Sequence, residues 1–206
     1  MDRTSLIERI VDIEWQMFSS VNNAGGKAAC QTDSVTFRIM RSSQCATWDE
    51  ALLSGWLADL ETAQAQGRNL MSEKYARMME STFPEEFALI ADRLPPLDPG
   101  AARKIEEIVA IHLNWKEELD ERYPHLADRG RPLRSADDST GLPSLETYMR
   151  AELQTLSPAT IDLYHAATLK RVGKGESEAE ENLLNQVRQY GFTSLEEAEY
   201  YFGTHE

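Results

Sequence analysis

The sequence predicts an all-α fold, a single irregular bundle of eight or nine helices. Apolar residues recur every three or four positions along most of the 206-residue chain, which is the spacing of one helix face. Capping residues, glycines and prolines separate these stretches from one another. Only residues 34–40 combine β-branched side chains with the alternation of a strand, and a lone strand would have no partner. We therefore interpret that stretch as a helix capped by Asp33.

The first half of the chain contains four further predicted helices. The first covers residues 5–21 and is broken by the polar and glycine-rich stretch 22–26. Residues 47–50, Thr-Trp-Asp-Glu, have the pattern of a capping box, and the helix that follows extends to about residue 66, before Gly67. Shorter helices are expected after Ser72 and at Pro84, and the chain stops being helical at prolines 95 and 96.

The second half begins with the longest predicted helix, from residue 99 to about residue 123. Asp98 serves as its N-cap, and Pro99 suits the first helical position. Serines at positions 144, 157, 177 and 194 each precede a further helix. Gly173 and Gly191 are predicted to close two of these helices.

A length of 206 residues suits one domain, residues 1–206. Residues 128–143 differ from the rest, because they lack apolar periodicity and are rich in arginine, aspartate, glycine and proline. Such a long loop is often functional, and it is also a candidate boundary to a C-terminal helical part. We favour one domain, since each part alone holds few large apolar residues.

The chain is acidic. It has 21 Lys and Arg against 35 Asp and Glu, a formal net charge of −14. Nucleic acid and anionic membrane surfaces repel such a chain at long range, so we expect neither as a partner. No apolar run is long enough to span a bilayer, no signal-peptide pattern opens the chain, and two cysteines cannot form a disulfide framework. We expect a cytoplasmic location.

One block of the sequence is unusual. Glu14-Trp15-Gln16-Met17-Phe18 is followed by a Gly-Gly turn, by Cys30-Gln31-Thr32-Asp33, and by the run Thr36 to Arg41. In this order the motifs E-W-x-M-F, G-G, C-Q-x-D and T-F-x-I-M-R resemble the opening block of a bacterial family of unknown function. The dense match covers residues 14–48. The resemblance implies a bacterial origin and supplies no reaction.

Glu14 and Arg41 are predicted to form a buried pair. Glu14 lies four residues after Ile10 and three before Met17, so it points into an apolar stripe where an unpaired carboxylate is costly. Arg41 follows Phe37 by four and shares its apolar face, which makes it the most plausible partner. Such a pair could bind an anionic ligand or be purely structural, and both interpretations stay open.

Candidate catalytic residues are Glu14, Cys30 and His112. Cys30 follows the Gly-Gly turn and precedes a predicted helix start, where a thiol pKa is lowered, although a free cysteine is more often inert core. His112 faces inward on the long helix. With Glu14, Glu152 and His165 it would supply inward carboxylates and imidazoles, but the Glu-x-x-His pattern of bundle metal sites is absent. We therefore predict no metal site and take these side chains as satisfied core polar groups.

Arginines gather around the long loop. Arg129, Arg131 and Arg134 suit bidentate binding of a carboxylate or phosphate. Asp137 and Asp138 follow, so pairing within the loop is an equal alternative. Farther along, Glu176, Glu178, Glu180 and Glu181 are interpreted as a solvated face.

Two functions follow from these features, and no sequence motif identifies a reaction or a cofactor. The first is a small-molecule-binding domain or enzyme, with Glu14 as acid, base or anchor and Arg41 holding an anionic group. Its pocket would be completed by a polar rim and by the three loop arginines as a gate; the rim residues are Asn22, Gln31, Asp33 and Gln44. The second is a non-catalytic interaction or regulatory module, whose acidic surface binds a protein partner.

Overall fold

The computed structural model describes residues 2–22, 26, 28–139 and 141–205. These residues form eleven α-helices and three short 3₁₀ turns, with no β-strand among them. The all-α prediction is confirmed, and the predicted count of eight or nine was low. Single-turn helices such as α7, Pro124–Ala127, are too short to produce an apolar periodicity, which explains part of the difference.

Five helices make up the first half of the chain. They are α1 (Arg3–Ser19), α2 (Ser34–Cys45), α3 (Glu50–Ala65), α4 (Leu70–Thr82) and α5 (Pro84–Ala88). Asp33 caps α2, as predicted, by accepting a hydrogen bond from the amide of Thr36. The predicted capping box at residues 47–50 was wrong, because Asp49 and not Thr47 caps α3, while the Thr47 hydroxyl bonds elsewhere.

The second half contains the other six. They are α6 (Pro99–Arg122), α7 (Pro124–Ala127), α8 (Leu145–Leu153), α9 (Pro158–Lys174), α10 (Glu178–Gln189) and α11 (Leu195–Thr204). The stretch between α7 and α8 includes one 3₁₀ turn, Ser135–Asp137. The prediction that Gly173 closes α9 was wrong, because Gly173 lies inside this helix. Gly175 ends that helix, because its φ of 68° is a left-handed conformation that glycine adopts without strain.

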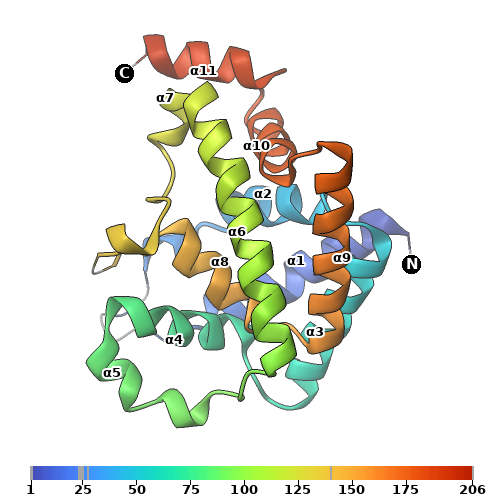
Figure 1. Cartoon of the computed structure of the whole chain (residues 1–206), viewed down its shortest axis with the longest axis vertical. Helices are drawn as coiled ribbons and strands as arrows, with labels where there is room; N and C mark the ends of the chain where they lie inside the picture. The colour runs from blue at the N-terminus through green and yellow to red at the C-terminus, as the bar shows by residue number, and fades with distance from the viewer. Residues whose placement is uncertain (1, 23–25, 27, 140, 206) are drawn as a thin grey trace.

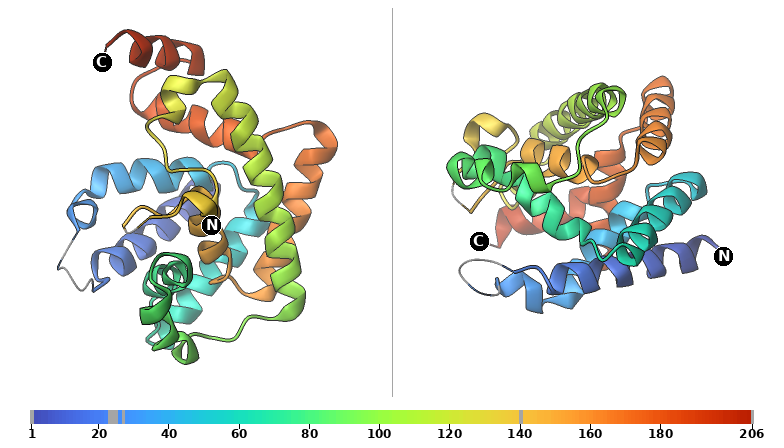
Figure 2. Two further views of the ribbon diagram at one scale, coloured as in Figure 1. Left: turned by 60° about the vertical axis from the view of Figure 1, so that its left-hand side comes forward. Right: turned by 90° about the horizontal axis from the view of Figure 1, so that it is seen from below.

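The main core lies between α1 and α6, which run on opposite sides of the bundle (Figures 1 and 2). α8 lies between them, as the view from below in Figure 2 shows. Fully buried apolar side chains fill this space, among them Ile10 of α1, Trp56 of α3, Ile108 of α6 and Ile161 of α9. The core therefore draws on helices from both sides of the long loop.

A second, smaller core lies at the C-terminal end of α6. Leu119 and Tyr123 pack there against Val187 of α10 and against Leu195 and Ala198 of α11. Figure 1 shows α11 at that end of the molecule, next to α7 and α10. The end of α6 thus supports a C-terminal unit that packs around its own apolar residues.

Candidate functional site

Glu14 and Arg41 form the predicted buried pair. Glu14 comes from α1 and is 0% exposed, while Arg41 comes from α2 and is 4% exposed. The arginine binds with two parallel hydrogen bonds, Nε to Oε2 at 2.8 Å and Nη2 to Oε1 at 2.6 Å. Trp56 of α3 donates a further bond from Nε1 to Glu14 Oε1 at 2.8 Å. Such charge-assisted, bidentate geometry is the strongest form of a protein hydrogen bond.

The pair extends into a larger cluster. Arg41 Nη1 donates to Gln44 Oε1 at 2.7 Å and to Glu152 Oε1 of α8 at 2.9 Å. The other oxygen of Glu152 accepts from Lys74 Nζ of α4 at 3.0 Å, and Lys74 also donates to Tyr148 Oη at 2.7 Å. We call Glu14, Arg41, Glu152 and Lys74 the buried charge network. It contains two carboxylates and two cations, so its formal charges cancel.

The network keeps Arg41, Lys74 and Glu152 ionised despite burial. Burial raises the pKa of Glu152, but Arg41 and Lys74 outweigh it and lower that pKa to about 2. Burial likewise opposes the charged form of Arg41, yet Glu14 and Glu152 raise its pKa well above the ordinary value. The pKa of Lys74 is raised in the same way, chiefly by Glu152. Each charge is therefore stabilised by its neighbours.

A closed network of this kind holds helices together. It connects α1, α2, α4 and α8, and the Glu14 oxygens already accept three bonds from Arg41 and Trp56. A general acid or base must reach a substrate, and neither Glu14 nor Arg41 lines the surface pocket between α4 and α8 or the smaller one beside α9. A catalytic role for Glu14 stays a prediction without geometric support.

A second buried polar cluster surrounds Glu178, the first residue of α10. Its Oε1 accepts hydrogen bonds from Thr47 Oγ1, Trp48 Nε1 and Tyr164 Oη, at 3.1, 3.0 and 3.0 Å. At 4% exposure Glu178 is part of the interior, so its interpretation as a solvated residue was wrong. It accepts bonds from the α2–α3 connection and from α9, and thereby attaches α10 to the main bundle.

His112 of α6 borders this second cluster. It is 8% exposed, as its inward position predicted. The centroid of its ring lies 4.8 Å from the ring centroid of Trp115 and 5.8 Å from that of Tyr164. Its Nε2 lies 3.6 Å from Glu178 Oε2 and has no hydrogen-bond partner within the described residues. Burial lowers the pKa of His112 more than Glu178 raises it. His112 is therefore held in its neutral form.

The predicted rim residues are not gathered into one pocket wall. Gln31 is buried and donates to the carbonyls of Phe18 and Val21, at 3.0 and 2.8 Å, which anchors the chain after α1. Asn22 is exposed, Asp33 caps α2, and Gln44 alone joins the buried charge network. Cys30 is exposed in the 3₁₀ turn Ala29–Thr32, whereas His112 is buried on α6.

The loop arginines have separate partners. Arg129 stacks on Phe202 at 4.0 Å, and Arg134 pairs with Glu117 at 2.9 Å. Only Arg131 approaches the buried charge network, because its guanidinium lies 4.9 Å from the ring centroid of Tyr148, the phenol that Lys74 contacts. Within the described residues none of these arginines forms an ion pair with Asp137 or Asp138, although Arg131 donates from Nη1 to the Pro143 carbonyl within the loop at 3.1 Å.

The inward carboxylates and imidazoles do not form a metal-binding group in the described part of the chain. His165 is only half-buried and pairs with Glu107 of α6 at 2.7 Å. Glu152 faces inward as expected, but its partners are Arg41 and Lys74.

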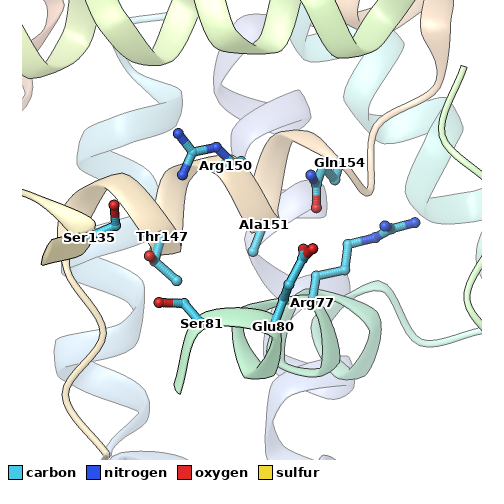
Figure 3. A pocket seen from close by; sticks show the side chains of 8 residues that line it. All are labelled: Arg77, Glu80, Ser81, Ser135, Thr147, Arg150, Ala151 and Gln154. Carbon is cyan, nitrogen blue, oxygen red and sulfur yellow. The ribbon is translucent and has the colours of Figure 1, made fainter. Parts of the chain in front are cut away.

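A surface pocket of about 350 Å³ lies where α4 packs against α8. α4 contributes Arg77, Glu80 and Ser81, while α8 contributes Thr147, Arg150 and Ala151 (Figure 3). Ser135 and Gln154 complete the lining. None of these residues was predicted from the sequence as a site residue. They come from short segments far apart in the chain, and none interrupts an apolar stripe as Glu14 does.

Asp138 organises one side of this α4–α8 pocket. Its carboxylate accepts hydrogen bonds from the Ser81 hydroxyl, from the Ser144 amide at 2.5 Å and from Thr147 Oγ1 at 2.6 Å. Burial acts to raise the pKa of Asp138, and these bonds reverse the effect and lower it. The long loop is thereby fixed to α4 and α8.

The two arginines of the pocket differ in their pairing. Arg150 binds Glu106 and Glu146, each at 2.8 Å, so its charge is compensated. Arg77 donates from Nη2 to the Pro95 carbonyl at 2.6 Å, and its buried Nε has no partner within the described residues. Burial is the main reason why the pKa of Arg77 is lowered.

A second pocket, of about 150 Å³, lies beside the C-terminal end of α9. Lys170, Arg171 and Lys174 line it together with Asp49 and Glu176. Arg171 already pairs with Glu181 at 2.8 Å and donates to the Thr47 carbonyl at 2.5 Å. Arg171 is therefore already engaged by its partners, whereas Lys170 makes no hydrogen bond or ion pair within the described residues.

The chain belongs to the family described as "Protein of unknown function (DUF4125)", whose model matches residues 4–200. This agrees with the resemblance that the opening block predicted. No curated protein and no solved structure matches the chain. None of the helices in the described residues has the length and apolar character needed to cross a membrane.

Proposed function

We propose that this protein is a small-molecule-binding helical domain whose ligand occupies the α4–α8 pocket. The observation that carries the proposal is Arg77, which lines that pocket, forms no ion pair within the described residues and has a buried Nε that makes no hydrogen bond there. A buried donor without a partner is unfavourable, and binding of an acceptor would relieve that cost. We assign no reaction, since Glu14 is enclosed by its own partners.

The buried charge network supports this proposal by fixing the two helices that form the pocket. Lys74 of α4 lies three residues before Arg77, and Glu152 of α8 directly follows Ala151. The ion pair between Lys74 and Glu152 therefore joins α4 to α8 beside the pocket. A rigid supporting shell of this kind is what a ligand site needs to keep its geometry. The Glu14–Arg41 pair would then act as a support, and the ligand would bind next to the network.

The size of the pocket is also suitable. A volume of about 350 Å³ falls in the range of roughly 300–1,000 Å³ that is common for small-molecule sites. The expectation of a bacterial, cytoplasmic protein remains part of this proposal, and rests on the opening block and on the cysteine content of the sequence.

A thermal-shift screen with a library of small polar metabolites tests the proposal. Gln154, which makes no side-chain hydrogen bond within the described residues, can be changed to Trp to fill the pocket entrance. The matched control is Gln64→Trp on the exposed face of α3. We expect compounds that raise Tm of the native protein and of Gln64→Trp but not of Gln154→Trp. Equal shifts in all three proteins, or no shift with any compound, would contradict the proposal.

A second candidate function, a protein-interaction module, is favoured by the exposed aromatic residues of the C-terminal unit. Tyr200 is 73% exposed, its neighbour Tyr201 is 43% exposed and Tyr190 is 54% exposed, and apolar side chains that gather on a surface mark protein-interaction sites. Native mass spectrometry of the protein purified from its own host tests this candidate. A second polypeptide that is lost from a Tyr190→Ser, Tyr200→Ser double variant would support it, and an unaccompanied chain would argue against it.

A further inference from the structure

Three side chains that line the α4–α8 pocket, Glu80, Ser81 and Thr147, can only accept hydrogen bonds from a ligand. The hydroxyls of Ser81 and Thr147 both donate to Asp138 Oδ2. Because each hydroxyl has one proton, only their lone pairs remain for a ligand. The Glu80 carboxylate adds two more acceptor oxygens, and it makes no hydrogen bond or ion pair within the described residues. Figure 3 shows that Glu80 extends from α4 toward Ala151.

Other side chains of the pocket offer donors. Arg77 Nε is buried and makes no hydrogen bond within the described residues, and Arg77 forms no close ion pair there, although Glu73 and Glu80 act electrostatically to raise its pKa against the effect of burial. Figure 3 shows the Arg77 side chain passing beside Glu80 toward the side of Gln154, whose amide can also donate. Arg150 adds no uncompensated charge, since Glu106 and Glu146 both pair with it.

We propose that the ligand of this pocket is a zwitterion that carries an ammonium and a carboxylate group, with a free α-amino acid as the simplest case. The inference rests on the proposed function of the pocket. An ammonium group has three donors and no acceptor, which complements Glu80, Ser81 and Thr147. A carboxylate complements the unpaired donor of Arg77 by a charge-assisted hydrogen bond.

Ligands with one charge match the pocket less well. A simple anion would leave the acceptors of Glu80, Ser81 and Thr147 facing its own oxygens. A simple cation would leave the buried Nε of Arg77 without a partner. The Ala151 side chain forms an apolar part of the lining between these groups, where the carbon skeleton of the ligand would lie.

Isothermal titration calorimetry with the twenty free α-amino acids tests the inference. The tightest binder is then compared with its N-acetyl derivative, which lacks the ammonium, and with its decarboxylated amine, which lacks the carboxylate. We expect at least one amino acid to bind and each derivative to bind ~10-fold or more weakly, since each leaves polar groups of the site unpaired. Derivatives that bind as tightly as the amino acid would overturn the inference.

Two variants assign the ends of the ligand. Arg77→Gln should weaken binding of the amino acid and leave binding of the amine unchanged, whereas Glu80→Gln should weaken the amino acid and leave the N-acetyl form unchanged. Arg103→Gln and Glu85→Gln, on exposed positions outside the pocket, are the matched controls and should bind as the native protein does. If Arg77→Gln does not fold, Arg77→Lys replaces it in this test, because it keeps the positive charge. If either variant lost its preference for the amino acid over both the amine and the N-acetyl form, the assignment would be contradicted.

The inference and the proposed function fail in different ways. If no amino acid binds while other compounds stabilise the native protein but not Gln154→Trp, the zwitterion inference is wrong and the pocket function stands. If an amino acid binds Gln154→Trp as well as it binds the native protein, the pocket is not its site and both are wrong.

Discussion

Lys74 and Glu152 form a buried ion pair, with 3.0 Å between Nζ and Oε2, that joins α4 to α8 at the edge of a pocket. Lys74 is fixed further by Tyr148, whose hydroxyl lies 2.7 Å from the ammonium. The pair belongs to a network in which two carboxylates and two cations neutralise each other. We propose that this network fixes α4 and α8, which form the walls of the α4–α8 pocket.

Removing one partner of this pair should destabilise the protein strongly. Lys74→Met leaves Glu152 with a single cation in a buried environment, and we expect a loss of about 3–5 kcal/mol in the free energy of unfolding. Urea denaturation followed by circular dichroism measures it. The double variant Lys74→Met, Glu152→Leu should recover part of that loss, because it removes both charges of the pair and leaves Glu14 and Arg41 to compensate each other. A single variant within about 1 kcal/mol of the native protein would be inconsistent with this role.

Glu14→Gln tests whether the Glu14–Arg41 pair is structural. The amide oxygen can replace only one carboxylate oxygen, and the amide nitrogen cannot accept the remaining bond, so we expect a loss of similar size, about 3 kcal/mol. Provided that the variant is folded, its affinity for a pocket ligand should stay within a few-fold of the native value. A variant that is more stable than the native protein but does not bind the ligand would instead indicate that Glu14 takes part in ligand binding.

The decrease in the free energy of unfolding at acid pH should depend on Glu152. Its pKa is lowered to about 2 in the folded protein, so the unfolded chain binds a proton first as pH falls. The stabilisation is therefore complete above about pH 5 and is lost progressively toward pH 2, and amounts to about 3 kcal/mol. Unfolding free energies measured across this range in the native protein and in Glu152→Gln give the contribution. Parallel curves for the two proteins would contradict it.

His112 should contribute a second, milder pH dependence. Burial lowers its pKa, with Glu178 acting in the opposite direction and Arg171 in the same one. Because the unfolded chain accepts the proton more readily, stability should begin to fall as pH drops below about 6.5. His112→Phe should flatten Tm between pH 7 and pH 5. If the variant keeps the slope of the native protein, another group is responsible.

The two cysteines should differ in reactivity. Cys30 is exposed, whereas Cys45 is fully buried and burial raises the pKa of its thiol, so little thiolate forms. A chromogenic disulfide reagent should therefore modify one thiol per folded chain rapidly and the second only after unfolding. Cys30→Ser should abolish the rapid phase. Two rapid thiols in the native protein would show that Cys45 is accessible.

The parts of the site that could be predicted are those where a polar residue interrupts an apolar stripe. Glu14 and Arg41 were recognised in this way, and each lies where the stripe indicates. Glu152 was recognised as inward, but Lys74 was not, because a lysine in a short helix usually extends into solvent. Glu178 was misjudged, since it stands among glutamates that are mostly accessible and its burial depends on Trp48 and Tyr164 from distant segments.

The α4–α8 pocket could not be predicted from the sequence. Its hydroxyls are oriented by Asp138, which belongs to a loop without periodicity, and the loop reaches α4 only through the tertiary fold. The partners of the loop arginines could not be predicted from the sequence either. Arg129 stacks on Phe202 of α11, an aromatic residue 73 positions away in the chain.

The most direct test of the account is to locate the bound ligand by amide chemical-shift perturbation in ¹⁵N-labelled protein. With the tightest compound from the screen, we predict that the largest shifts fall at residues 77–81 of α4, at residues 147–153 of α8 and at Gln154, which follows α8. Small or no shifts are expected beside Lys170 and Lys174. Shifts concentrated at that second pocket, or at the C-terminal unit around Tyr200, would show that the α4–α8 pocket is not the binding site.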